Sequence, residues 1–285
     1  MSWRKNIIAV IMSGLMLVNI ISLPVHAAVA VVETEPNNTR ENAMLIQANR
    51  ETASGTVTGS NPGHYAVEGS TSANDDDWYK VFLSEGIQYV SLNSGANTLV
   101  FDVYYDTGEV PILSDTYEKA TFGVTAYQFE AQASGYYYVR IHTNMSSSQK
   151  YYLLVGDPNY SVAECSVRIG SVTMSGSNST ISFNLINEAR LPQDAVVYSM
   201  KVNNVGTTDV KGISIRNNSI DITTNLNRYT WYKSGLTSLS LPLRSSWQVT
   251  FEYSKNITLT PTVTFQYVYP ITSKAVDDSI TITSR

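Results

Sequence analysis

The chain contains the stretch Asn74-Asp75-Asp76-Asp77-Trp78-Tyr79, in which three consecutive aspartates lead directly into two aromatic residues. The aromatic pair opens the run 78–83, whose aromatic and β-branched residues are typical of a strand. Three adjacent carboxylates repel one another unless solvent or a cation takes up their charge. The stretch therefore predicts a β-strand that begins at an acidic turn able to attract a cation.

A second polar segment, Glu33-Thr34-Glu35-Pro36-Asn37-Asn38-Thr39, lies upstream of the first. It offers two carboxylates and two amides, and an extended chain with this spacing can aim several of their oxygens in one direction. Hard oxygen ligands in this number and mixture suit calcium better than any softer metal. The two segments together therefore predict a β module clamped by calcium. The alternative is a solvated acidic turn that caps a strand, with 36–38 as an ordinary turn.

Four shorter motifs accompany these two segments. In chain order, the six are Glu-x-Glu-Pro-Asn-Asn-Thr at 33–39, Asn-Ala at 42–43, Gly-Thr-Val at 55–57, Asp-x-Asp-Trp-Tyr at 75–79, Gly-Tyr-Tyr-Tyr-Val-Arg-Ile at 135–141 and Tyr-Tyr-Leu-Leu-Val at 151–155. Together they resemble the bacterial pre-peptidase C-terminal domain family over about residues 33–157. The resemblance implies a small jelly-roll-like β-sandwich, a type usually appended to secreted peptidases, with collagen-binding relatives in clostridial collagenases.

The resemblance also implies a set of metal ligands. The positions that match the family's ligands are Glu33, Glu35, Asn37, Asn38, Asp77 and, through its backbone carbonyl, Thr56. Asp75 is the further side chain we expect in the shell. The collagen-binding relatives carry a carboxylate where this chain has Asn74, so either Asn74 or Asp75 could fill that position. Six or seven oxygens complete a calcium shell.

The triple tyrosine of 136–138 lies in a run of strand character, where neighbouring side chains alternate between the two faces of a sheet. We expect Tyr137, Val139 and Ile141 in the core, which leaves Tyr136, Tyr138, Arg140 and His142 pointing outward. An exposed stripe of Tyr and Arg suits the recognition of a polymer. The alternative is an ordinary half-buried strand.

The collagen-binding relatives use aromatic and aliphatic side chains on the strand after the Gly-x-Tyr-Tyr motif. In this chain those outward places fall at Arg140, His142 and Asn144. None of the three repeats the relatives' residue type, so the resemblance implies that the fold is kept while the collagen surface is lost.

Residues 1–27 have the pattern of a secretory signal peptide, with Arg4 and Lys5 before an apolar run at 7–18 and Val25-His26-Ala27 at the end. The alternative is a retained membrane anchor, but Asn19 and Pro24 interrupt the apolar stretch. The sequence end at 280–285 has neither a hydrophobic tail nor a sorting signal. We therefore expect a secreted, extracellular protein that begins at Ala28.

Without Arg4 and Lys5, 17 basic residues face 24 acidic ones, a formal charge of −7. This balance argues against binding to nucleic acid through phosphates and against an anionic membrane surface. Cys165 is the only cysteine, so no intrachain disulfide can form and the core, with any metal, must hold the fold.

Low charge, abundant Ser and Thr and 19 tyrosines predict an all-β protein of two tandem β-sandwich domains. The first, at 28–157, is expected to be jelly-roll-like, and the second, at 162–285, Ig-like and of no family that we recognise. The break between them is Gly156-Asp157-Pro158-Asn159. The strands expected in the first are 51–58, 78–83, 87–92, 99–105, 123–130, 136–142 and 150–155, with a long loop at 59–74. The strands expected in the second are 165–174, 179–187, 196–203, 210–216, 219–224, 237–243, 246–253 and 261–269.

Candidates for catalysis are few. After residue 27 the chain has two histidines, His64 and His142, and it has no His-Glu-x-x-His, Gly-x-Ser-x-Gly or P-loop motif. A Ser-His-Asp triad stays open, because its members need not be close in sequence. We expect both histidines to be solvent-exposed and Cys165 to be a small, half-buried apolar side chain. The sequence therefore predicts no enzyme activity.

Two classes of function remain. The first is a secreted binding module that adheres to an extracellular protein or glycan polymer. The second is a structural or chaperone-like accessory to a separately encoded secreted peptidase. A weaker third possibility is an enzyme whose site is not recognisable in the sequence.

Overall fold

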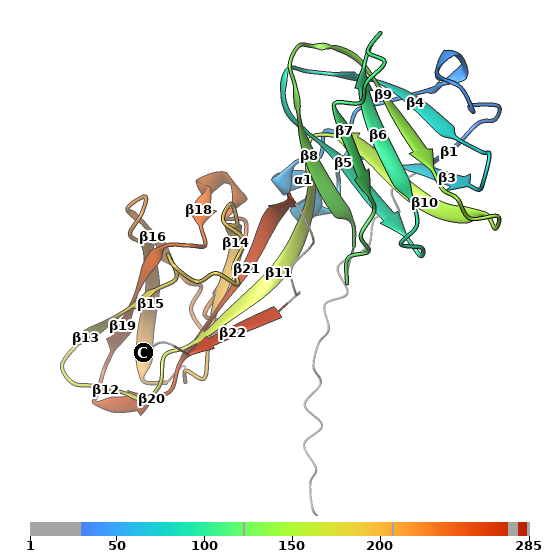
Figure 1. Cartoon of the computed structure of the whole chain (residues 1–285). Coiled ribbons are helices and arrows are strands. Elements are labelled where there is room, and N and C mark those ends of the chain that lie inside the picture. The colour runs from blue at the N-terminus through green and yellow to red at the C-terminus, as the bar shows by residue number, and fades with distance from the viewer. Residues whose placement is uncertain (1–29, 122, 207, 273–278, 284–285) are drawn as a thin grey trace, which may run out of the picture.

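The computed structural model describes residues 30–121, 123–206, 208–272 and 279–283 (Figure 1). In these residues the chain forms strands β1 to β22, one short α-helix, α1 (Ala53–Thr58), and two 3-10 turns, η1 (Arg40–Asn42) and η2 (Thr237–Leu239). The predicted all-β class is confirmed. No helix in the described part of the chain is long and apolar enough to span a bilayer. The predicted signal peptide lies outside the described residues.

Two five-stranded sheets form the first sandwich. One sheet has the order β1 (Val31–Val32), β3 (Val67–Thr71), β10 (Gln149–Gly156), β5 (Gly86–Ser94) and β8 (Thr125–Ala131). The other has the order β2 (Met44–Ile46), β4 (Asp77–Leu83), β9 (Gly135–His142), β6 (Val100–Tyr105) and β7 (Leu113–Thr116). Their inner faces meet in one apolar cluster.

Alternation along β4 and β9 builds the middle of this core. The two strands pair antiparallel, with Tyr79 opposite Val139 and Val81 opposite Tyr137, and all four side chains are buried. Because the side-chain period is two, this register puts the intervening residues of both strands on the outer face. The inward and outward residues predicted for 136–142 are confirmed.

Three predictions for the first sandwich are wrong. Residues 51–58 form no strand, because the Thr52 hydroxyl caps α1 by accepting from the Gly55 N–H at 3.0 Å and Gly59 ends the helix with φ +70°. The expected loop at 59–74 contains β3. Tyr105, expected on the apolar face of 99–105, is exposed instead at the end of β6.

A second sandwich follows. Its first sheet has the order β17 (Tyr232–Lys233), β14 (Val196–Asn203), β21 (Thr262–Ile271), β11 (Asn159–Arg168) and β22 (Ser279–Thr283), with β18 (Leu241–Pro242) paired to β14. Its second sheet has the order β13 (Asn178–Asn184), β19 (Ser246–Tyr253), β15 (Val210–Asn217) and β16 (Ile222–Asn225), and β12 (Val172–Met174) pairs with β20 (Ile257–Leu259). The two predicted apolar faces are buried, at Trp247, Val249, Phe251 and Tyr253 and at Val263, Phe265, Tyr267 and Tyr269.

Three predictions for this part need correction. The expected strand 165–174 is two strands, since β11 starts at Asn159 and ends at Arg168 while β12 pairs elsewhere. The expected strand 237–243 is η2 followed by β18. Cys165 is fully buried in β11 rather than half-buried, and burial raises the pKa of its thiol to about 12.

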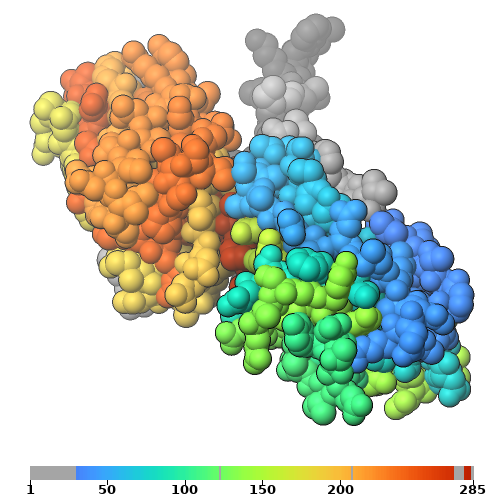
Figure 2. All heavy atoms as spheres, turned by 90° about the horizontal axis from the view of Figure 1, so that it is seen from above, coloured from blue at the N-terminus to red at the C-terminus, as the bar shows by residue number. Residues whose placement is uncertain are grey.

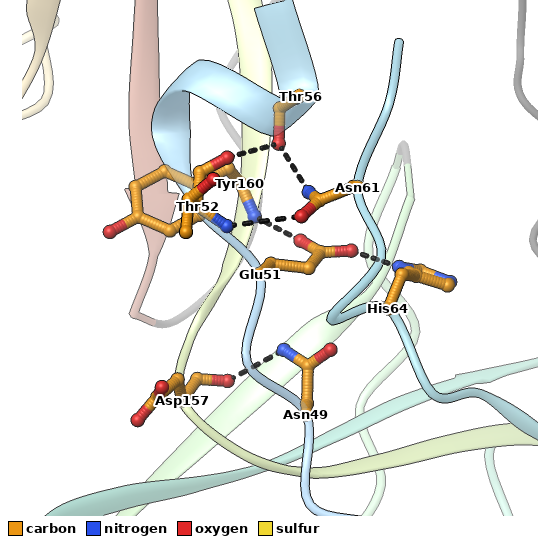
Figure 3. Close-up of polar contacts among 8 residues, drawn as sticks. All are labelled: Asn49, Glu51, Thr52, Thr56, Asn61, His64, Asp157 and Tyr160. Carbon is orange, nitrogen blue, oxygen red and sulfur yellow. Dashed lines mark hydrogen bonds and ion pairs between the residues drawn. The ribbon is translucent and has the colours of Figure 1, made fainter.

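The two sandwiches meet at a short junction where only two residues separate β10 from β11 (Figure 3). Asn49 holds the end of β10: its N–H donates to the Val155 carbonyl at 2.7 Å and its side-chain amide to the Asp157 carbonyl at 2.8 Å. Glu51 accepts from the Tyr160 N–H at 2.8 Å. Figure 2 shows the resulting two lobes side by side, with the blue-to-green part of the chain in one and the yellow-to-red part in the other.

His64 belongs to this junction and is not the solvent-exposed residue that we expected. Its Nδ1 pairs with the second carboxylate oxygen of Glu51, and the ring is largely covered. Since Glu51 is itself buried, a polar partner on each oxygen compensates for the water that the carboxylate loses.

Candidate metal centre and outer sheet face

Three carboxylates converge at one end of the first sandwich. Glu33, Glu35 and Asp77 each offer one oxygen, and these oxygens lie within 4.8 Å of one another. Backbone pairing brings them together: the Glu33 N–H donates to the Glu68 carbonyl of β3 at 3.0 Å, and the Trp78 N–H of β4 donates to the Asn37 carbonyl at 2.9 Å. The acidic segment upstream is thereby fixed against the start of β4.

Hydrogen bonds orient all three carboxylates, and Glu35 accepts one from the Asn37 N–H at 2.8 Å. One Glu33 oxygen accepts from the Ser70 N–H at 2.7 Å, and the other accepts from the Tyr79 hydroxyl at 2.9 Å. The Tyr151 hydroxyl donates to Asp77 Oδ2 at 2.5 Å. Gly69 makes room for this arrangement, because a Cβ there would lie 2.5 Å from the Tyr151 hydroxyl and 2.8 Å from Glu33 Oε2.

Asp77 is the most constrained of the three. Its side chain is fully buried, and no group in the described part of the chain hydrogen-bonds to its Oδ1. Burial first, and then the negative charges of Glu33, Asp75 and Glu35, raise the pKa of Asp77 to about 8, although the Tyr151 hydrogen bond acts in the opposite direction. A buried carboxylate oxygen without a partner is costly, and a bound cation would both satisfy it and displace the proton.

The residues fit calcium. The three groups offer only oxygen, and a Ca–O distance of about 2.4 Å places ligands on opposite sides of the ion about 4.8 Å apart. The oxygens of Glu33, Glu35 and Asp77 lie within that separation of one another, so all three can reach one ion. Soft or borderline metals would favour sulfur or imidazole ligands, which this cluster does not contain. When bound, such an ion would supply structural charge neutralisation at this end of the sandwich.

The other ligand candidates of the two acidic segments are Asn37, Asn38, Asn74 and Asp75. Asn37 is buried, and its amide nitrogen is placed to donate to both Glu35 carboxylate oxygens at 3.1 Å. The Asn38 amide donates to Asp75 Oδ1 at 3.0 Å. Of the two open candidates, Asn74 is exposed in the turn before β4 with φ +71°, whereas Asp75 is partly covered and its charge acts on Asp77.

Thr56 is wrong as a ligand. It lies in α1, where its hydroxyl donates to the Thr52 carbonyl at 3.2 Å and accepts from the Asn61 amide at 3.1 Å (Figure 3). The helix packs beside β11 and β21 at the junction, so its carbonyls do not take part in the carboxylate cluster. The physical reason is the capped helix, which holds the Gly-Thr-Val motif of the resemblance at the junction.

The residues that support the cluster were not predicted from the sequence; they are Tyr79, Tyr151, Ser70 and Gly69. The sequence did indicate a role for the tyrosines. Both lie at positions where the alternation of a strand points the side chain into the core, and a buried phenol requires a hydrogen-bond partner. Which partner it would find depends on the packing of β4 against β10 across the sandwich, and this contact joins positions 72 residues apart.

Replacing Tyr151 by Phe is expected to lower the free energy of unfolding by about 1–3 kcal/mol in the presence of a chelator, because Asp77 then loses its remaining hydrogen bond. Urea unfolding measures the change. Tyr152→Phe removes the neighbouring, exposed phenol from the opposite side of β10 and should stay within about 0.5 kcal/mol of the wild type. Equal stability of the two variants would contradict the role given to Tyr151.

The predicted binding residues lie on the outer face of β4, β9 and β6. Tyr136 is exposed, while Tyr138 and Arg140 are partly covered. Across the strand pairs, Phe82 lies opposite Tyr136 and Lys80 opposite Tyr138, so aromatic and cationic side chains adjoin on this face.

Cations lie over the rings of this face. The Lys80 ammonium is 4.4 Å from the centre of the Tyr136 ring, and the Arg40 guanidinium is 4.5 Å from that of Tyr138. Arg40 comes from η1 and also lies 5.5 Å from the Tyr104 ring, which it helps to bury. Contacts of this kind contribute roughly 0.5–1 kcal/mol each at exposed sites.

Arg140 is paired rather than free. Its Nε and Nη2 donate to Asp102 Oδ2 at 2.9 and 2.5 Å, and its Nη1 lies 3.4 Å from Asp76 Oδ2. His142, which we expected to be solvent-exposed, is partly covered with Nε2 3.2 Å from the same Asp102 oxygen. Burial opposes the ionisation of Asp102, but hydrogen bonds from His142, Ser114 and Arg140 outweigh it and lower the pKa of Asp102.

No protein-family model matches the sequence, and no curated protein sequence matches it. Among solved structures, the pre-peptidase C-terminal domain of a collagenase from Bacillus anthracis is similar at 17% identity with a TM-score of 0.29, over 40% of this chain and 93% of that one. A triple jelly-roll protein of the turret of an archaeal virus gives 13% identity and a TM-score of 0.27, over 74% and 58% of the two chains. The exported protein XepA gives 13% and 0.23, over 72% and 86%. Similarities at this level establish no shared function.

Proposed function

We propose that this protein is a secreted, non-catalytic binding module that adheres to an extracellular polymer and whose first sandwich is stabilised by calcium. The observation that carries the proposal is the array of adjoining aromatic and cationic side chains on the outer face of β4, β9 and β6. A sheet face that only meets water needs no such array, whereas exposed tyrosines and basic groups are the residue types enriched at recognition surfaces.

The same face divides into contact and support residues. Tyr136 and Tyr138 are the side chains that we expect to touch a ligand. Tyr136 is exposed, and Tyr138 is the next residue along β9 on the same outer face. Arg140 would act differently: its two hydrogen bonds to buried Asp102 tie β9 to β6 and hold the tyrosines at a fixed spacing.

The carboxylate cluster supports the calcium part of the proposal. Glu33 and Glu35 belong to the segment before β2, whereas Asp77 opens β4, so one ion would bind both parts of the chain. Stabilisation by an ion suits a protein that has a single cysteine and therefore no internal disulfide.

Retention on insoluble polymers tests adhesion. The panel is collagen, cellulose, chitin, peptidoglycan and an acidic polysaccharide coupled to beads, each with and without calcium. A Tyr136→Ala, Tyr138→Ala variant is expected to lose retention by on the order of tenfold. The matched control replaces two tyrosines elsewhere, Tyr152 and Tyr229, both exposed and outside this face. Retention on none of the five polymers would reject the proposed function, and equal retention of both variants would reject the role of Tyr136 and Tyr138.

A further inference from the structure

Three adjoining cavities follow the segment 44–50 of the first sandwich, and we call them together the 44–50 groove. The largest, of about 490 Å³, shares Leu45, Gln47 and Tyr65 with a cavity of about 220 Å³ that reaches Val31 of β1. It shares Ala48, Arg50 and Phe82 with a third of about 210 Å³ that reaches Asp157 at the junction. Because these cavities follow one another along 44–50 and share lining residues, together they suit an extended ligand better than a compact one.

Exposed apolar side chains form the wall of the groove that adjoins the array on β4 and β9. Leu45 is 65% exposed, Phe82 48% and Tyr136 42%. The rings of Phe82 and Tyr136 pack edge to face with their centres 5.4 Å apart. A contiguous exposed apolar group of this kind is a feature of binding surfaces.

Basic groups border the same wall. Arg50 lines the groove, Lys80 lies over Tyr136 at its rim, and Arg40 lies over Tyr138 beyond it. None of the three forms an ion pair with a carboxylate among the described residues. The charges of Asp106 and Glu41 act on Lys80 and Arg40 from farther away. In a chain with a net charge of −5, this strip is a local positive surface.

We propose that the 44–50 groove, with Lys80 and Arg40 beside it, binds a linear acidic polysaccharide that carries carboxylates along its chain. This inference rests on the proposed function and specifies its ligand class. The apolar faces of sugar rings would pack on Phe82 and Tyr136, the Gln47 amide and Tyr65 hydroxyl would bind sugar hydroxyls, and Arg50 and Lys80 would meet the carboxylates.

The charge of the protein and the short strand at the groove favour this class over two others. A nucleic acid carries charge at higher density than such a polysaccharide, so the acidic remainder of the chain would repel it more strongly. A peptide would require backbone partners, and β2, the edge strand at the groove, offers only three residues.

Hyaluronate and its methyl ester are a matched pair of probes, since they share one backbone and differ in charge. Affinity electrophoresis of the purified protein in gels that contain either polymer measures binding. We expect hyaluronate to retard the protein, the effect to weaken as salt rises, and the methyl ester to bind on the order of tenfold more weakly. Equal retardation by both polymers would overturn the requirement for acidic groups.

Variants locate the site. Arg50→Gln with Lys80→Gln should weaken binding to hyaluronate on the order of tenfold, and Phe82→Ala should do so as well. Lys119→Gln with Lys150→Gln removes the same charge from exposed positions that line none of the three cavities, and it should bind as the wild type does. Unchanged thermal unfolding of all variants establishes that binding, not folding, is altered. An equal loss of hyaluronate binding in the Arg50/Lys80 and the Lys119/Lys150 double variants would contradict the location of the site in the 44–50 groove.

The outcomes separate this inference from the proposed function. Binding to another polymer of the retention panel, without binding to hyaluronate or to the acidic beads, rejects the acidic polysaccharide and leaves adhesion standing. Binding to polyglutamate in place of hyaluronate rejects the glycan class. Binding to no polymer rejects both proposals.

Discussion

Calcium in millimolar excess is expected to raise the unfolding temperature of the first sandwich by roughly 10 °C. A ligand that binds only the folded state at a hundredfold excess over its Kd adds about 2.7 kcal/mol to the free energy of unfolding, and for a unit of this size each kcal/mol is worth roughly 4 °C. The physical reason is the convergence of Glu33, Glu35 and Asp77, of which Asp77 is buried with one oxygen unbound. Scanning calorimetry of the purified protein in chelator and in calcium measures the shift.

The control for calcium uses exposed carboxylates, so that folding without metal is preserved. Glu35→Gln removes one candidate ligand and should abolish most of the shift, whereas Glu130→Gln, on the exposed side of β8, should retain it. The same shift in both variants, or no shift in the wild type, would show that these carboxylates bind no calcium.

Gly156→Ala is expected to lower the free energy of unfolding by about 3 kcal/mol. Gly156 has φ +136°, a conformation that L side chains rarely adopt, and a Cβ there would lie 2.6 Å from the Asn49 carbonyl oxygen. That oxygen belongs to a backbone that is itself bonded to Val155 and Asp157, so it cannot move without breaking the junction.

Gly170→Ala separates the cost of the backbone conformation from the cost of the close contact with Asn49. Gly170 has φ +83°, and a Cβ there would meet nothing within 4 Å, so only conformational strain remains. We expect a loss of about 1 kcal/mol, to be compared with Gly156→Ala by urea unfolding. Equal losses would mean that the contact with Asn49 contributes nothing to the junction.

The local alternation of apolar and polar residues predicts much of the burial pattern of this protein. The alternation at 136–142 predicts which residues of β9 are buried, and the apolar faces at 247–253 and 263–269 predict two central strands of the second sandwich. Burying these side chains is worth about 1.5–3 kcal/mol each, so the period-2 pattern dominates any local preference. The acidic segments at 33–39 and 74–77 likewise indicate in advance where carboxylates would gather.

Where the intrinsic preference for helix or strand is weak, the residue types of a short segment predict its secondary structure poorly. Residues 51–58 contain Thr and Val, but 53–58 form α1, because a capping hydroxyl at Thr52 and a left-handed Gly59 satisfy the ends of one short helix. Thr56, which the family resemblance offered as a ligand through its carbonyl, lies in this helix instead. His64 and Arg140 have unremarkable local sequences, and their carboxylate partners, Glu51 and Asp102, lie 13 and 38 residues away.

The sequence by itself thus determined the class of fold, the strands with strong alternation and the residue types available for a metal. Only the tertiary structure decided which carboxylates meet, that Tyr79 and Tyr151 support them, and that the outer face of β4 and β9 continues into the 44–50 groove. The physical reason is that the alternation of side chains along a strand determines which face of the sheet each residue occupies. Which residue lies opposite it depends on the register of the strands and on the packing of one sheet on another. Those two are set by contacts between residues far apart in the chain, such as Tyr79 with Tyr151 and Asn49 with Val155.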